Sequence, residues 1–238
     1  MKRGYMSQEK NFEAIIHYTF ANEGLLRQAL THSSYANEKH MKKLSDNERL
    51  EFLGDAVLEI ITSEFLYQQY QNLSEGELTK MRASIVCEQT LALCANQIQL
   101  GDFLYLGKGE ENTGGRLRKS LLSDAFEAVI GAIYLDKGLE CAKAFIHSYV
   151  LTDIEKKQLF HDSKTLLQEI VQSRENCTLE YVLSNVEGPD HARVYTIEAW
   201  INESVMGVGK GSTKKTAEQE AAYETILKLK QEGSDTCI

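Results

Sequence analysis

The stretch at residues 120–135 is apolar almost all the way round a helix, and only Asp124 and Glu127 interrupt it. Such a helix is stable only when other elements of the chain surround it. A buried carboxylate without a partner costs several kcal/mol, so the fold must supply protons, basic side chains or a metal ion to these two acids. The small residues Ala128 and Gly131 on the same face would let another helix or a ligand approach closely.

A second stretch, residues 47–58, carries more acids. A capping-box pattern at residues 45–48 predicts that a helix starts there. At about 100° per residue, Glu48, Glu51 and Asp55 fall on one stripe of that helix, opposite its apolar residues. Like charges at this spacing repel one another unless a cation compensates them. Gly54, which costs a helix about 1 kcal/mol, indicates a close neighbour at that turn.

Three explanations of these acids are open from the residues alone. The stripe could be a solvated helix face, and Arg116, Arg118 or Lys119 could form ion pairs with the acids of residues 120–135. We favour a metal site, because four or five carboxylates with no nearby His or Cys pattern offer the hard oxygen ligands that suit Mg²⁺ or Mn²⁺. Such a cation fits hydrolysis of a phosphate ester. Glycoside hydrolysis would not need so many acids.

The pattern of the chain changes near residue 160. Residues 11–157 have the periodicity of helices, which predicts an all-α domain. A second, α+β domain is predicted from a helix at 163–172, strands at 179–184, 194–201 and 204–208, and a helix at 213–230. We therefore expect two domains, a helical one at residues 1–158 and a smaller one at residues 159–238, with the order helix, three antiparallel strands, helix.

Other features of the sequence exclude several classes of protein. No apolar stretch approaches the ~20 residues that span a bilayer. The N-terminus turns polar at once, which predicts a cytoplasmic protein with no membrane partner. Five scattered cysteines without a Cys-x-x-Cys pair predict reduced thiols rather than a disulfide framework or a zinc site. The net charge of −9 gives no sign of nucleic-acid binding.

Four motifs nevertheless resemble those of bacterial ribonuclease III, in the family's order. They are LTHSSYANE at 30–38, NERLEFLGDAVL at 47–58, SEGELTKMRA at 74–83 and SDAFEAVIGA at 123–132. The resemblance covers residues 12–230 and implies an all-α nuclease domain followed by one double-stranded-RNA-binding domain. It implies a divalent-metal-dependent endoribonuclease that hydrolyses double-stranded RNA to 5′-phosphate and 3′-hydroxyl ends, in processing of rRNA precursors and mRNA.

The resemblance also assigns roles to single acids. It implies that Glu51, Asp124 and Glu127 ligate the divalent cation, which is Mg²⁺ with Mn²⁺ as a substitute. It implies that Asp55 and Glu127 are indispensable for cleavage, and that Glu48 has a supporting role. A non-catalytic RNA-binding relative would be favoured by loss of one of the ligating or catalytic acids, and none is lost. An RNA chaperone that used only the second domain would leave the acids unexplained.

Three further residues of the first domain are interpreted through the resemblance. Phe52 interrupts the acidic arc, and the matching family side chain inserts into the partner subunit of a homodimer in which each site cuts one strand. An ordinary core phenylalanine is the alternative. Glu75 matches an acid near the subunit interface and the RNA. Glu59 matches no functional acid of the family, so we expect it on a solvated face.

The segment GKGSTKKTAEQEAA at 209–222 resembles the most characteristic motif of double-stranded-RNA-binding domains. Its glycines let the backbone approach a phosphate, and Lys214 and Lys215 precede a helix whose N-terminus already attracts anions. Lys210 completes this set. The resemblance adds Gln168 and His191 as contacts to the minor groove. Residues 161–238 hold 8 basic against 13 acidic residues, so binding must come from a local, salt-sensitive patch.

Overall fold

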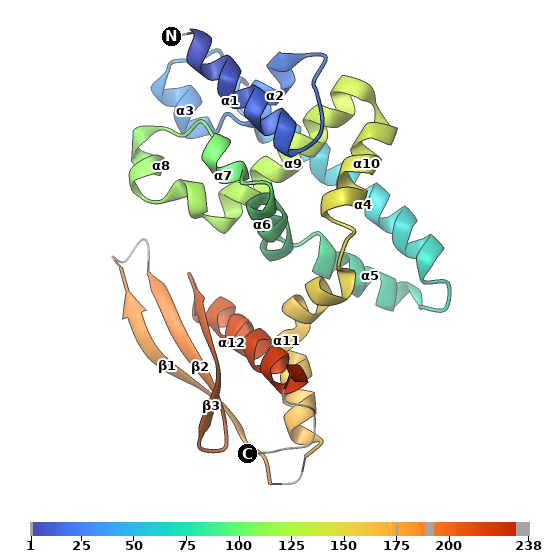
Figure 1. The fold of residues 1–238 in the computed structure, drawn as a ribbon, viewed down its shortest axis with the longest axis vertical. Coiled ribbons are helices and arrows are strands. Elements are labelled where there is room, and N and C mark those ends of the chain that lie inside the picture. The colour runs from blue at the N-terminus through green and yellow to red at the C-terminus, as the bar shows by residue number, and fades with distance from the viewer. Residues whose placement is uncertain (1, 175, 189–192, 232–238) are drawn as a thin grey trace. The chain divides into compact units, whose positions relative to one another are not determined.

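The computed structural model describes residues 2–174, 176–188 and 193–231 (Figure 1). The chain forms two compact units, Met1–Ile154 and Glu155–Ile238. The sequence placed the division four residues later, after residue 158. The helix predicted at residues 163–172 starts earlier than expected, because one helix, α11 (Ile154–Gln172), also includes residues 154–162. The segment holds no proline or glycine, so nothing in it interrupts a helix.

The first unit is all-α, as predicted, and Figure 1 shows its helices around α9. Its elements are α1 (Lys2–Ile15), α2 (Glu23–Ala29), α3 (Ser33–Glu38), α4 (Glu48–Gln69), α5 (Glu75–Ile85), α6 (Glu88–Gln97), α7 (Leu100–Phe103), α8 (Lys108–Asn112), the 3₁₀ turn η1 (Gly115–Leu117), α9 (Lys119–Lys137) and α10 (Leu139–Tyr149).

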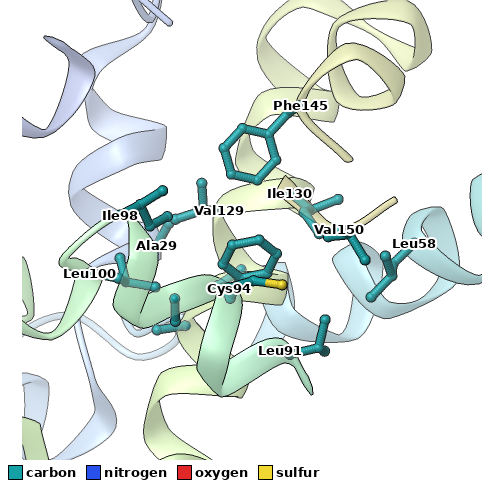
Figure 2. Close-up of a cluster of buried hydrophobic side chains, with 14 of the residues drawn as sticks. Ala29, Leu58, Leu91, Cys94, Ile98, Leu100, Val129, Ile130, Phe145 and Val150 are labelled. Carbon is teal, nitrogen blue, oxygen red and sulfur yellow. The ribbon is translucent and has the colours of Figure 1, made fainter. Parts of the chain in front are cut away.

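Helix α9 is the centre of the hydrophobic core. Its side chains from Leu121 to Ile133 are buried except on the face of the two acids. Figure 2 shows Ile130 of α9 among Leu58 of α4, Cys94 of α6 and Phe145 of α10. The prediction of a buried helix at residues 120–135 is therefore confirmed.

Helices α4 and α9 cross with their backbones in contact. A Cβ atom added to Gly54 would lie 1.8 Å from the carbonyl oxygen of Glu127, and one added to Gly131 would lie 2.3 Å from that of Leu50. Any side chain at either position would force the helices apart. The close neighbour predicted for Gly54 is thus the backbone of α9.

The start of α4 differs from the prediction. Asn47, not Ser45, is the N-cap residue, and it makes no side-chain cap hydrogen bond. The capping box predicted at residues 45–48 is therefore wrong. Instead, the buried Asn47 donates its backbone N–H to the carbonyl oxygen of Thr31 at 2.9 Å. A tertiary hydrogen bond thus positions the first turn of α4 against the connection between α2 and α3.

The second unit has the predicted order of helix, three antiparallel strands and helix. After α11 come β1 (Leu179–Glu187), β2 (Val194–Ile201), β3 (Ser204–Gly211) and α12 (Lys214–Gln231), in the sheet order β1-β2-β3. Leu167 and Val171 of α11 and Ile226 of α12 pack together with Ile201 of β2 in the core. Strands β1 and β3 each continue three residues beyond the predicted ends, because their pairing with β2 continues.

Two expectations concern the chain as a whole. None of the described helices combines the length and the apolar character that crossing a bilayer requires. Cys87, Cys94 and Cys141 are free thiols, as expected, whereas Cys177 is disulfide-bonded. The expectation that every cysteine is reduced is therefore wrong for Cys177.

The glycine crossing gives a stability prediction. Gly54→Ala should lower the free energy of unfolding by about 3 kcal/mol, since the methyl group overlaps backbone that cannot move aside. Gly76→Ala in α5 is the matched control, because a Cβ atom there meets nothing within 4 Å, and its free energy of unfolding should stay equal or rise slightly. Denaturant unfolding of both variants tests this, and equal stabilities would contradict the crossing.

Candidate active site

The crossing of α4 and α9 brings the predicted acids together. Helix α4 contributes Glu51, and α9 contributes Asp124 and Glu127, all half-buried. One carboxylate oxygen of each lies within 4.8 Å of those of the other two. Glu48 and Asp55, on the same stripe of α4, are exposed at the edge of this cluster. All donors are carboxylate oxygens, which suit a hard divalent cation.

The basic residues upstream of α9 do not neutralise these acids through Arg116 or Arg118. Arg116 pairs with Glu111 at 2.6 Å and donates to two backbone carbonyl oxygens. Arg118 pairs with Glu110. Both guanidinium groups therefore stabilise the loop before α9, and the ion-pair alternative fails for these two residues.

Electrostatic repulsion in the cluster is severe. Burial, together with the negative charges of Asp55, Glu51 and Asp124, raises the pKa of Glu127 to about 8. Burial and the neighbouring acids also raise the pKa of Glu51. Burial raises the pKa of Asp124, although the hydrogen bond from Ser123 and the nearby His32 oppose this rise. The cluster therefore holds its full negative charge at neutral pH only when a cation compensates it.

Sequence reasoning missed His32. It is the N-cap residue of α3, where its Nδ1 accepts a hydrogen bond from the Ser34 backbone N–H at 3.2 Å. Its ring is near enough to Asp124 to lower the pKa of that carboxyl group. The residue lies in the first of the four motifs, but the chain has no second histidine at a metal-ligand spacing, so no pattern marked it.

Phe52 is on the surface of this unit and is 80% exposed. It borders a surface pocket of about 550 Å³ that Leu25, Leu53 and Leu135 also line. The alternative of an ordinary core phenylalanine is therefore wrong. Such an exposed aromatic ring beside a pocket lined in part by leucines is a feature of protein interaction surfaces.

Two other acids behave differently from the cluster. Glu59 lies at the surface with 45% of its side chain exposed, and its Oε2 lies 3.7 Å from Nη1 of Arg82. Glu75 is exposed in the first turn of α5, where it accepts a hydrogen bond from Thr79.

The predicted RNA contacts of the second unit are exposed where the structure describes them. Lys214 and Lys215 are in the first turn of α12, and Lys210 is on β3. A Cβ atom on Gly211 would lie 2.6 Å from the backbone nitrogen of Ala217, so the end of β3 packs against that first turn. The backbone positions of the three lysines therefore share the edge of the unit where β3 meets α12. His191 lies outside the described residues.

Gln168 is exposed on α11, and the packing of α11 against α12 fixes its position relative to the lysines. Nζ of Lys164, one turn before Gln168, lies 2.5 Å from Oε2 of Glu218 on α12 and 5.2 Å from the ring centroid of Tyr181. Ser163 also donates to the carbonyl oxygen of Gln219. The two helices are thus joined by polar contacts as well as by the core.

Comparison with known proteins gives the same division. Residues 22–154 match the family model "Ribonuclease-III-like", and residues 163–229 match "Double-stranded RNA binding motif". The chain is 50% identical to Ribonuclease 3 of Bacillus licheniformis over 94% of this chain and 91% of the relative. It is 48% identical to Ribonuclease 3 of Bacillus cereus strain AH187 over 96% of this chain and 94% of the relative.

Solved structures are similar to the first unit. Two structures of the nuclease domain of ribonuclease III from Campylobacter jejuni match it at 44% identity. One has a TM-score of 0.56 and covers 59% of this chain and 94% of that chain. The other has a TM-score of 0.55 with coverages of 59% and 92%. The first is described as showing structural flexibility in a region involved in dimer formation.

The raised pKa of Glu127 gives a pH-dependent prediction. Between the ordinary value of 4.5 and about 8, the folded state binds a proton that the unfolded state has released, so stability falls as the pH rises through this window. In chelator at about pH 8.5, Glu127→Gln should therefore unfold at a higher temperature than the native chain. At about pH 4 the advantage should vanish, because both states then carry the proton.

The exposed Glu88 of α6 supplies the control. Glu88→Gln should show no gain in thermal midpoint on going from acid to alkaline pH. A Glu127→Gln variant that is less stable than the native chain at alkaline pH in chelator would contradict the repulsion described above.

Proposed function

Because the chain belongs to the ribonuclease III family, we propose that its acid cluster holds a divalent cation for cleavage of double-stranded RNA. The family makes the protein a double-stranded-RNA endoribonuclease. The observation that carries the assignment of the site is the set of three carboxylate oxygens, from Glu51, Asp124 and Glu127, within 4.8 Å of one another.

The donor set fits Mg²⁺, with Mn²⁺ as a substitute. Oxygen ligands without nitrogen or sulfur favour these cations. The repulsion that raises the pKa of Glu127 is relieved by a bound divalent charge. When bound, such a cation lowers the pKa of a coordinated water and stabilises charge on the phosphate. The residues of the chain that would hold it are Glu51, Asp124 and Glu127.

The chain's own acids have distinct tasks in this proposal. Asp55, exposed beside the cluster, orients the attacking water and accepts its proton. Glu127, the acid with the most strongly raised pKa of the three, is both ligand and catalytic residue. Glu48 supports the site from the first turn of α4. Attack of water on phosphorus breaks the bond to the 3′-oxygen, which takes up a proton from solvent, and this gives 5′-phosphate and 3′-hydroxyl ends. The proposed substrates are rRNA precursors and mRNA.

The second unit supplies duplex binding. Lys210, Lys214 and Lys215 share one edge and would contact phosphates, while Gln168 would reach the minor groove. The proposal for His191 rests on the motif alone. Because these contacts read backbone shape rather than base edges, the unit provides affinity for duplex RNA and not sequence choice.

We also propose that the protein is a homodimer. The exposed ring of Phe52 and the pocket beside it are complementary features that a second copy of the chain can cover. A two-fold pair of sites would then cut both strands of one duplex. A monomeric mass in solution at micromolar concentration would contradict this arrangement.

The nuclease site is tested with a long perfect RNA duplex. With Mg²⁺ the native chain should cut it, and with chelator it should not. Glu127→Gln should lower the cleavage rate by about a hundredfold or more, because it removes a ligand and a charge, yet it should still bind the duplex. Glu88→Gln should cut at the native rate. Binding without cutting by the native chain, with Mg²⁺ and Mn²⁺ alike, would leave a binding protein only.

The basic edge of the second unit is tested by duplex binding in chelator. Lys214→Gln and Lys215→Gln should each weaken binding equally for duplexes of different sequence and should each reduce the slope of log affinity against log salt by about 1. Lys228→Gln, at the opposite end of α12, is the control and should bind as the native chain does. Equal affinities for all three variants would contradict the assignment of the edge.

A further inference from the structure

Helix α5 places Arg82 against the middle of α4. Its Nη1 donates a hydrogen bond to Oγ of Ser63 at 3.0 Å and lies 3.7 Å from Oε2 of Glu59. Ser63 in turn donates to the carbonyl oxygen of Glu59 at 2.6 Å. These contacts from α4 fix the position of the guanidinium group and occupy only its Nη1 atom. Its other N–H groups have no hydrogen-bond partner among the described residues.

A surface pocket of about 480 Å³ lies in front of this guanidinium group. It is lined by Asp55, Ala56, Glu59, Ile60, Ser63 and Arg82. Asp55 lines this pocket and also lies at the edge of the acid cluster, since its charge acts on Glu127. The pocket thus adjoins the site of cleavage and has one fixed cation in its wall.

The ion pair with Glu59 does not explain Arg82. The separation of 3.7 Å is long, and the two side chains are 34% and 45% exposed. Pairs of this kind contribute little to stability, because water screens them and the side chains lose freedom. The unpartnered N–H groups are free to bind a ligand in the pocket that Arg82 lines.

The substrate supplies the missing partner. An RNA strand that reaches the acid cluster brings a row of phosphates past Glu48, Glu51 and Asp55, and one divalent cation offsets only part of this repulsion. A guanidinium group binds a phosphate through two parallel N–H groups. We propose that Arg82 binds the backbone phosphate next to the one that is cleaved. This inference rests on the proposed function and adds an RNA-binding residue to the same site.

The test is the kinetics of Arg82→Ala in the full chain, with Mg²⁺ and a long RNA duplex. The contact exists before and during cleavage, so KM should rise by about tenfold while kcat stays within about twofold. The slope of log kcat/KM against log salt should fall by about 1, since one phosphate contact is lost. Arg82→Lys keeps the charge without the fork and should have a KM between those of Arg82→Ala and the native chain.

Glu59→Gln is the matched control, because it removes the ion pair but not the guanidinium group, and its KM should not rise. An unchanged KM in Arg82→Ala would overturn the inference. Recovery of the native KM in the double variant Arg82→Ala, Glu59→Gln would also overturn it, since Arg82 would then act only by neutralising Glu59. Loss of the dimer mass in both Arg82→Ala and Arg82→Lys would assign the residue to a subunit contact instead.

Different results would contradict the nuclease activity and the phosphate contact of Arg82. A native chain that does not cut the duplex contradicts the nuclease itself. A native chain that cuts, beside an Arg82→Ala variant with unchanged KM and salt slope, contradicts only the phosphate contact. If Arg82→Ala unfolds, the same comparison is made with Arg82→Lys. This variant keeps the positive charge but lacks the two parallel N–H groups of the guanidinium.

Discussion

The backbone contact between α4 and α9 at Gly54 and Gly131 is the interaction on which the first unit depends. With Cβ distances of 1.8 and 2.3 Å to carbonyl oxygens, the crossing accepts hydrogen atoms and nothing larger. It fixes the separation of two helices whose next turns carry the acids. The oxygens of Glu51, Asp124 and Glu127 approach within 4.8 Å because the glycines at the crossing have no side chains. In ordinary helix packing the axes are about 8–10 Å apart, and side chains rather than backbone atoms fill the contact.

The same crossing has an energetic cost for the folded chain. Carboxylates held this close repel one another, and partial burial removes the water that would screen them. The core around α9 has to offset this repulsion in the absence of a cation, with contributions from α2, α4, α6, α7 and α10. Arg116 and Arg118 contribute from the loop before α9, where they pair with Glu111 and Glu110 rather than with the cluster.

Helices and strands could be predicted from the sequence where their own residues show a clear hydrophobic periodicity. The buried helix at residues 120–135, the acid stripe after residue 47 and the helix, three strands, helix order follow from periodicity. The features that were predicted wrongly or missed depend on tertiary contacts. The N-cap of α4 is Asn47 because its N–H bonds to Thr31, far away in the sequence. The positions of two further residues also come from tertiary packing. His32 lies near Asp124 because the connection between α2 and α3 packs beside α9. Arg82 lines its pocket because α5 packs against α4.

The edge formed by Lys210, Lys214 and Lys215 has a consequence for how the second unit meets RNA. The remainder of the unit carries more acids than bases, and Glu180 of β1 and Glu203 of the turn between β2 and β3 are exposed. Separated charges of opposite sign give the unit an electric dipole, and a polyanion exerts a torque on it during approach. Encounters that present the wrong face are repelled before contact. In the proposed binding mode, the uneven charge would therefore orient collisions so that the duplex meets the basic edge first.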